Sequence, residues 1–242
     1  MQMRRRNGGT AMIFVNRVDA GLKLAKKLDA YAGQKDVIVL AIPRGGVPVA
    51  FQVASELHAP LDVFVVRKLG VPSREELAFG AIATGGIRVL DEQIVESMGV
   101  SDMQIERITA REKDELDRRE HVYRGNRPFP NIENKTIILV DDGIATGAST
   151  RAAISALRRL RPARIVLAVP VAPAMTCKSL QGEVDDLICL FMPKFFYAIG
   201  QFYEDFSQVS DQEVMDLLQF NATQCIQEIP ANCQDIGKGV HP

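Results

Sequence analysis

The sequence has no excess of charge of either sign, and this limits what it can bind. Its 242 residues carry 29 Lys and Arg against 30 Asp and Glu, which gives a formal net charge of −1. Such a balance supplies no overall field that would attract nucleic acid or an anionic membrane. We therefore expect neither as a partner, and we expect any anionic ligand to be held by local groups.

Long apolar runs and paired cysteines are also missing. No stretch reaches the length of a membrane span or of a signal-peptide core, so we expect a cytoplasmic protein. The four cysteines form no C-x-x-C pair, so we expect free thiols: Cys177, Cys189, Cys225 and Cys233. The three histidines are scattered and show no metal-ligand spacing: His58, His121 and His241.

The apolar pattern predicts an α/β fold. With 47% hydrophobic residues the chain can bury a core, and its length suits one domain with additions. Short Val- and Ile-rich runs predict strands covered on both faces: Val37 to Ile42, Leu61 to Val66, Thr136 to Val140, Arg164 to Val171 and Asp186 to Phe191. Helical spacing occurs before the first of these runs, at Val18, Leu22, Ala25 and Leu28, and after the third, at Ala153, Leu157 and Leu160. We expect a mainly parallel central sheet flanked by helices.

Two capping boxes predict further helices. Ser101 and Gln104 open a charge-rich segment that runs to Tyr123 and carries a thin apolar set, Ile105, Ile108 and Leu116, so we expect a largely exposed helix there. Ser210 and Glu213 precede Val214, Leu217 and Leu218 and predict a short C-terminal helix. Residues 225–242 are expected to form a loosely held tail.

The most informative segment is TIILVDDGIATGAST, residues 136–150, in which an apolar strand ends in two carboxylates and a turn of small residues leads into a helix. Gly143, Ala145, Gly147 and Ala148 let a ligand approach the backbone, and the N–H groups that open the helix suit a phosphate. Thr146, Ser149 and Thr150 add hydroxyl donors. Asp141 and Asp142 suit vicinal hydroxyls or a phosphate-bound metal ion.

Other functions for this segment are less well supported. A nucleotide triphosphatase would need a G-x-x-x-x-G-K-[ST] loop, which the sequence lacks. A dinucleotide site would need G-x-G-x-x-G between a strand and a helix, which is also missing. A purely structural turn with incidental acids remains as the alternative, and we favour the binding site because acids, small residues and hydroxyls coincide at one strand end.

VDDGIATGAST resembles the diphosphate-sugar binding signature of type I phosphoribosyltransferases. AIPRGGVPVA, residues 41–50, resembles the diphosphate loop of that family, and VVRKLGVPSREELAFGAI, residues 65–82, resembles its next strand and flexible loop. The resemblance implies a phosphoribosyltransferase-like domain over residues 10–224, with a flexible loop at about 69–90 and a C-terminal hood at about 192–220. We also expect a homodimer.

The resemblance assigns roles to individual residues. Asp141 and Asp142 would hold the ribose hydroxyls of 5-phosphoribosyl 1-diphosphate and, through that ligand, Mg²⁺. The 5-phosphate would lie against Thr146, Gly147, Ala148, Ser149 and Thr150, and Ala145 would also belong to the ligand-binding segment. The diphosphate would be bound by Arg44, Gly45, Gly46, Arg67 and Lys68. The catalytic residues would be Asp141, Asp142, Arg44 and Lys68.

The expected reaction transfers the phosphoribosyl group to a nitrogenous base and releases diphosphate. Ala145 stands where hypoxanthine and guanine transferases carry an acid, so the acceptor base is unspecified. An aromatic group could stack on the acceptor or pack a C-terminal subdomain: Phe195, Phe196, Tyr197, Phe202, Tyr203 and Phe206. A regulator that binds the same ligand without catalysis and a phosphoribosyl hydrolase remain alternatives.

Overall fold

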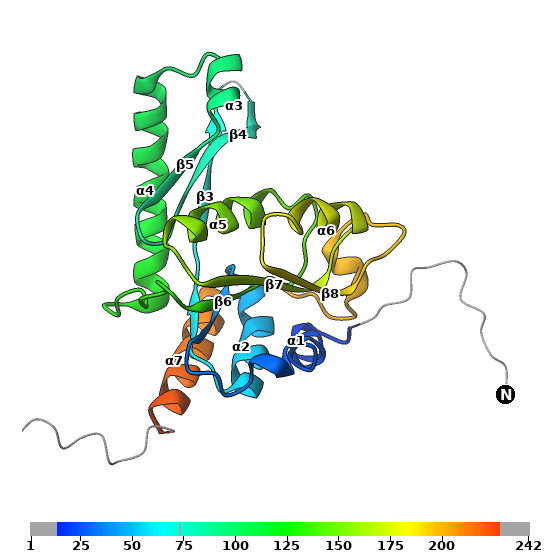
Figure 1. The fold of residues 1–242 in the computed structure, drawn as a ribbon. Coiled ribbons are helices and arrows are strands. Elements are labelled where there is room, and N and C mark those ends of the chain that lie inside the picture. Colours follow the sequence, from blue (N-terminus) through cyan, green and yellow to red (C-terminus); the bar gives the residue numbers. More distant parts are fainter. Residues whose placement is uncertain (1–13, 73, 228–242) are drawn as a thin grey trace, which may run out of the picture.

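The computed structural model describes residues 14–72 and 74–227, which form an α/β body with a projecting arm (Figure 1). The body is built on a five-stranded sheet in the order β2-β1-β6-β7-β8, in which all neighbouring strands are parallel. Its strands are β1 (Val37–Ala41), β2 (Leu61–Val63), β6 (Thr136–Val140), β7 (Arg164–Val171) and β8 (Asp186–Phe191). The predicted fold class is confirmed.

Helices cover both faces of this sheet, which is why its strands are apolar at successive positions. Val39 and Ala41 face a core shared with α1 (Arg17–Ala25), α2 (Gly46–Leu57) and α7 (Asp211–Gln227). Ile38 and Leu40 face the opposite core, shared with α5 (Ala148–Arg159) and α6 (Ala174–Leu180). Figure 1 shows these two helical layers below and above the sheet.

Most of the predicted strands are confirmed, but the run from Leu61 to Val66 is divided. β2 ends at Val63, and Val66 begins β3 of a second sheet. The division follows from hydrogen bonding, because Val65 donates its N–H to Thr84 Oγ1 at 2.9 Å and accepts from the N–H of Thr84 at 2.9 Å. Because Val65 pairs with Thr84, the chain leaves the main sheet after β2 and continues into the second sheet.

The buried face of α1 also differs from the prediction. Val18 and Leu22 are 43% and 38% exposed, whereas Ala20, Gly21 and Leu24 are buried. A Cβ at Gly21 would lie 2.6 Å from Val49 O of α2, so the helix turns its small residues toward its neighbour. The close packing of α1 on α2 therefore determines which face of α1 is buried, although the larger apolar side chains lie on the other face.

The arm comprises residues 66–124. Its antiparallel sheet has the order β3-β4-β5, with strands β3 (Val66–Val71), β4 (Arg74–Ala83) and β5 (Ile87–Leu90). Two helices follow, α3 (Glu92–Ser97) and α4 (Asp102–Arg124). Residues 69–90, predicted as a flexible loop, therefore lie mostly in strands, and whether they move remains a prediction.

Helix α4 confirms the expectation for the charge-rich segment. Ser101 and Gln104 form both hydrogen bonds of a capping box, and Ile105, Ile108 and Leu116 are buried. At the other end Arg124 pairs with Asp62 at 2.8 Å, with its side chain only 4% exposed. That buried ion pair joins the base of the arm to β2.

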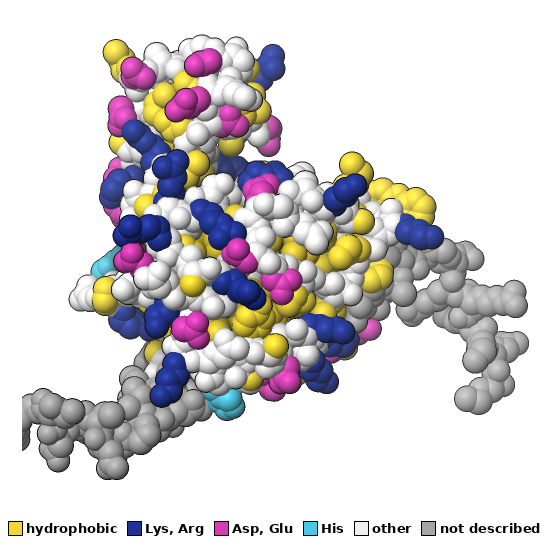
Figure 2. Space-filling model, in the orientation of Figure 1, with side chains coloured by type: hydrophobic (Ala, Val, Ile, Leu, Met, Phe, Trp, Pro, Cys, Tyr) yellow, Lys and Arg dark blue, Asp and Glu magenta, His cyan; other side chains and the backbone are white. Residues whose placement is uncertain are grey.

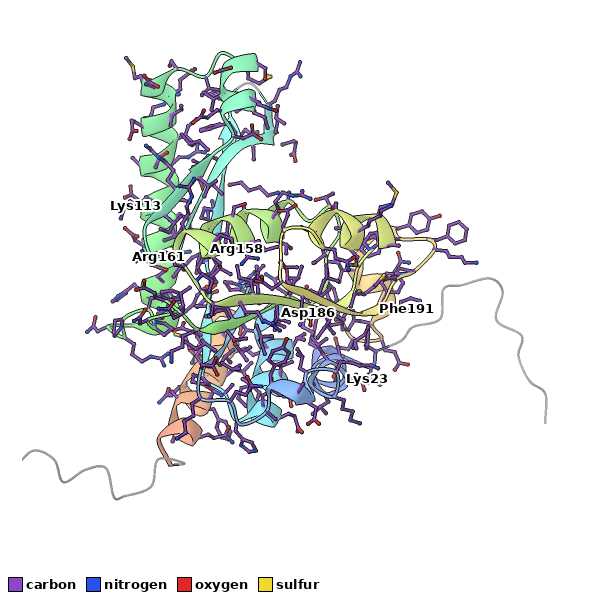
Figure 3. The ribbon with its side chains drawn as sticks, viewed as in Figure 1. Lys23, Lys113, Arg158, Arg161, Asp186 and Phe191 are labelled. Atoms are coloured by element: carbon purple, nitrogen blue, oxygen red, sulfur yellow. The ribbon has the colours of Figure 1, made fainter. Side chains whose placement is uncertain are left out.

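The hood divides into packed and exposed aromatic residues. Phe202 and Tyr203 are buried, in a cluster with Phe14 and Val171. Phe191, labelled at the end of β8 in Figure 3, lies 5.7 Å from Phe202 between ring centroids. Packing on the body thus accounts for part of the aromatic group, while two members stay on the surface: Phe195 is 71% and Tyr197 is 87% exposed.

The predictions for the C-terminal tail, the cysteines and the surface charge can be compared with the described residues. α7 continues to Gln227, three residues into the segment expected as a tail, and residues 228–242, with Cys233 and His241, lie outside the described residues. Cys177 and Cys189 are free thiols. No helix in the described ranges is long and apolar enough to cross a membrane. Charges of both signs are interspersed over the face shown in Figure 2.

Helix α7 is fixed to the edge of the sheet by a buried amide. Asn221 is 3% exposed, accepts a hydrogen bond from Leu61 N–H at 2.8 Å and donates to Ala59 O at 3.3 Å. Within the described part of the chain, these two backbone groups have no strand beyond β2 to pair with in the main sheet. The side chain of Asn221 serves in place of that strand.

We expect Asn221→Leu to lower the free energy of unfolding by about 1–3 kcal/mol, because Leu61 N–H and Ala59 O would be left buried and unpaired. Gln219→Leu, at an exposed position of α7, is the matched control and should change stability by less than about 0.5 kcal/mol. Chemical denaturation followed by circular dichroism measures both, and equal effects of the two substitutions would contradict the proposed support of β2.

Candidate functional site

The candidate site lies at the carboxyl ends of β1 and β6, where two loops meet. Ala41 and Val140 pair across these neighbouring parallel strands. A turn over residues 43–45 follows β1 and leads into α2, and the acid pair, Asp141 and Asp142, follows β6. Parallel pairing therefore places two motifs that are far apart in the sequence at one edge of the sheet.

Glycine is required where these loops touch. A Cβ at Gly45 would lie 2.0 Å from Asp142 Oδ2, and one at Gly46 would lie 2.9 Å from Val140 O. Any side chain at Gly45 would have to displace the carboxylate. The peptide bond between Pro43 and Arg44 is cis. The structure thus brings together five predicted site residues: Arg44, Gly45, Gly46, Asp141 and Asp142.

Arg17 is a site residue that the sequence did not reveal. Its Nε and Nη2 each lie 2.8 Å from Asp142 Oδ2, and its Nη1 donates to Ser207 O at 2.7 Å. Its guanidinium also stacks over the ring of Phe206, 3.9 Å from the centroid. Arg17 and Asp142 are separated by 125 positions. Only the tertiary fold relates them, so no local pattern could have found this residue.

The carboxylates of the acid pair are held in different ways. Asp142 is 7% exposed, and its backbone O accepts a hydrogen bond from Tyr203 Oη at 2.6 Å. Asp141 Oδ1 accepts from the N–H of Asp142 at 2.9 Å. Burial raises the pKa of Asp142, and the adjacent charge of Arg17 opposes that rise. Burial and the neighbouring Asp142 charge raise the pKa of Asp141 well above its ordinary value.

A cavity of about 330 Å³ opens beside the acid pair; we call it the acid-pair cavity. Its lining residues are Arg17, Arg44, Gly45, Asp142, Phe206, Gln208 and Val209. Arg44 Nη1 lies 3.7 Å from Asp211 Oδ1, which also accepts a hydrogen bond from Tyr123 Oη at 2.8 Å. Two guanidinium groups therefore face one small space whose far wall comes from the hood.

The phosphate-loop segment, Ala145–Thr150, leads into α5 as predicted. Gly147 has φ of +79° and is the N-cap of the helix, a backbone conformation that glycine adopts without strain. The first N–H groups of a helix have no partner within it, so they are available to an anion. Thr176 Oγ1 donates to Ala145 O at 2.8 Å and fixes the start of this turn.

Arg67 and Lys68 lie apart from the acid-pair cavity. They line a cleft of about 690 Å³ between β3 and α4, and Ser149 reaches the same cleft. Arg67 donates from Nε and Nη2 to Glu112 Oε2 at 2.9 and 2.6 Å, so a ligand would have to compete with this carboxylate. Lys68 is exposed and also borders a second cleft that reaches Ala148. Their predicted roles remain predictions.

The acid pair fits a metal ion that brings most of its own ligands. Among residues 14–72 and 74–227, no group of three or more His, Cys, Asp or Glu side chains converges. Two carboxylates can supply oxygen ligands to Mg²⁺, which commonly keeps waters and takes further oxygens from a bound phosphate. The donor set at Asp141 and Asp142 therefore fits Mg²⁺ delivered with a phosphate ligand.

We expect Asp141→Asn to stabilise the protein near neutral pH. The raised folded-state pKa means that the native chain holds a proton that the unfolded chain has lost, so the wild type loses stability as pH rises above the ordinary value of 3.8. Asparagine keeps the Oδ1 acceptor but cannot ionise. The gain should be about 1.4 kcal/mol for each unit by which the pKa is raised, and the two proteins should converge below that ordinary value.

Asp185→Asn is the control of opposite sign. Although burial raises the pKa of Asp185, hydrogen bonding from the N–H of Ile165 and the charge of Arg158 lower it overall. Removing that carboxylate should destabilise the protein at neutral pH and have little effect in acid. Thermal unfolding of the three proteins between pH 3 and 8 gives the comparison, and a stability difference for Asp141→Asn that does not grow with pH would contradict the assignment.

Comparison with known proteins gives this arrangement a family. Residues 13–207 match the phosphoribosyl transferase domain. A Mycobacterium tuberculosis (strain H37Rv) protein described as a phosphoribosyl transferase is 44% identical over 206 residues, or 85% of this chain and 46% of that protein. This chain thus spans about half the length of that curated relative.

A solved structure extends the comparison to the fold. The protein TT1426 from Thermus thermophilus is 40% identical and superposes with a TM-score of 0.77, covering 86% of this chain and 98% of the other. The match to the phosphoribosyl transferase domain, over residues 13–207, includes both motifs of the candidate site, which confirms the resemblance noted in the sequence. On these grounds the chain belongs to the phosphoribosyl transferase family.

Proposed function

We propose that this chain binds 5-phosphoribosyl 1-diphosphate with Mg²⁺ and transfers the phosphoribosyl group to a nitrogenous base, releasing diphosphate. The observation that carries the proposal is the contact between Gly45 and Asp142, which joins an arginine-bearing turn to an acid pair at adjacent strand ends. The family supports the same activity. The acceptor base remains unspecified.

Each part of the ligand has a matching group in the site. The backbone of residues 145–150 and the exposed hydroxyls of Thr146 and Ser149 suit the 5-phosphate, and the acid pair suits the ribose hydroxyls. Arg44, at the rim of the acid-pair cavity, suits the diphosphate because a guanidinium binds phosphate oxygens in a bidentate manner. Lys68 would reach the ligand from the arm. Mg²⁺ bound with the diphosphate would neutralise part of its charge.

The reaction breaks the bond between C1 of the ribose and the diphosphate oxygen, and the bonding electrons leave on that oxygen. The lone pair of the acceptor nitrogen forms the new C1–N bond, and the proton of that nitrogen passes to solvent. Positive charge develops on C1 and the ring oxygen while negative charge grows on the diphosphate. Asp141 and Asp142 lie on the side of the cation, and Arg44 lies on the side of the anion, so the residues stabilise both.

The hood offers a surface for the acceptor. Phe195 and Tyr197 are exposed, so their rings are available to stack on a planar base. Ala145 is exposed at the phosphate loop and supplies no carboxylate to the acceptor. We therefore propose that recognition of the base rests on stacking and backbone groups more than on an acid.

We expect Asp141→Asn and Asp142→Asn each to weaken the binding of phosphoribosyl diphosphate with Mg²⁺ roughly tenfold to a hundredfold, because each removes a charge-assisted hydrogen bond. Asp142 is buried and paired with Arg17, so replacing it can also disturb the fold. Asp62→Asn, which loses its pairing with Arg124, controls for that effect and should bind normally. Calorimetric titration compares the variants; unchanged affinity would remove the acid pair from the site.

Arg44→Ala separates catalysis from binding alone. Because the charge on the leaving group grows in the transition state, the variant should lose most diphosphate release while keeping appreciable affinity for the ligand. Arg88→Ala is a matched control, since Arg88 is similarly exposed (36% against 38%) and lies on the arm in a pair with Glu106. Diphosphate release is measured with a panel of purines, pyrimidines, other nitrogen heterocycles and water.

The outcome of that panel decides between the alternatives. Release with water alone would indicate a hydrolase. No release from protein that binds the ligand would favour a regulator and sink the enzyme proposal. Release that survives Arg44→Ala at the wild-type rate would leave an enzyme whose diphosphate lies elsewhere.

A further inference from the structure

The acid-pair cavity is lined by a second positive charge besides that of Arg44. Two guanidinium groups, Arg17 and Arg44, line it, and Asp142 is the carboxylate that lines it with them. Arg44 also has Asp211 at 3.7 Å, a long ion pair in which both side chains are well exposed, 38% and 43%. An exposed pair of this kind is weak and can yield to a ligand.

Arg17 is held rigidly at the wall of this cavity. Asp142, Ser207 O and the face of Phe206 hold the guanidinium on three sides, and its side chain is 11% exposed. These polar contacts use one N–H from each of its three nitrogens, whereas a guanidinium carries five. The group therefore retains donors and its full charge while its orientation is fixed, which is the state required of a preorganised anion-binding residue.

The chain contains a closely matched arginine that serves structure alone. Arg124 pairs with Asp62 at 2.8 Å, donates to Val63 O and lies over the ring of Phe129 at 5.0 Å. It therefore has the same three kinds of partner as Arg17: a carboxylate, a carbonyl and an aromatic ring. The difference is that Arg17, and not Arg124, borders the acid-pair cavity. The cavity gives Arg17 access to a ligand that Arg124 lacks.

We infer that Arg17 is a second diphosphate-binding residue, which faces the leaving group together with Arg44 while it orients Asp142. This inference rests on the proposed function and names the residue that completes its diphosphate end. Arg17 lies beside Asp142, one of the two carboxylates proposed to hold the sugar, and it lines the cavity proposed to hold the anion. It links the two halves of the ligand site, and through Phe206 and Ser207 it also links them to the hood.

Half-ligands test the inference because they separate the two ends of the substrate. We titrate wild type, Arg17→Gln, Arg17→Lys and Arg124→Gln calorimetrically with inorganic diphosphate, with and without Mg²⁺, and separately with ribose 5-phosphate. Arg17→Gln should weaken diphosphate binding roughly tenfold to a hundredfold, with or without the metal, and weaken ribose 5-phosphate binding by a clearly smaller factor of about threefold, because Asp142 loses the partner that orients it. Arg17→Lys should restore part of the diphosphate affinity, since it keeps the charge but not the planar fork.

Arg124→Gln is the control, and the other possible results separate a failure of this inference from a failure of the proposed function. Arg124→Gln should lower thermal stability and leave both affinities near the wild-type values. Diphosphate affinity that is unchanged in Arg17→Gln overturns the inference, as does an equal loss for both half-ligands, which would mean that Arg17 acts only by positioning Asp142. A wild-type protein that binds neither half-ligand would remove the proposed function itself, and the inference with it.

Discussion

The parallel pairing of β1 with β6 is the constraint on which the candidate site depends. Because Ala41 lies opposite Val140, the turn after one strand and the acid pair after the other begin at the same height along the sheet. The loops then meet so closely that Gly45 has no room for a side chain. A shift in register would separate the arginine from the carboxylates, so the central strands determine the chemistry although no strand residue takes part in it.

Much of this arrangement could be predicted from the sequence, because local patterns encode it. Strand ends, small residues and acids coincide at 136–150, and capping boxes mark the starts of α4 and α7. What could not be predicted depends on tertiary contacts. Arg17 is recognisable only through its contact with Asp142, and the burial of Gly21 in place of Val18 reflects close packing of α1 on α2. Likewise, β2 ends where Val65 pairs with Thr84, 19 positions further along the chain.

The acid pair shows how a binding site weakens the fold that carries it. Burial raises the pKa of both carboxylates, and each therefore costs stability when it ionises. Arg17 opposes this cost at both carboxylates without cancelling it, and at Asp141 the charge of Asp142 adds to the effect of burial. Asp141 is therefore the carboxylate whose charge is less well balanced by the protein. The proposed ligand and its Mg²⁺ would supply the positive charge and the hydroxyl partners that Asp141 lacks.

The position of the arm in the chain has a consequence for synthesis on the ribosome. Strands β1 and β2 emerge first, and the whole arm follows before β6 can pair with the open side of β1. During that interval an apolar central strand presents unpaired backbone groups, which is the form in which strands associate wrongly with other chains. Because the strands of the arm pair with one another and not with the main sheet, the arm adds few further unpaired strand edges while β1 waits for β6.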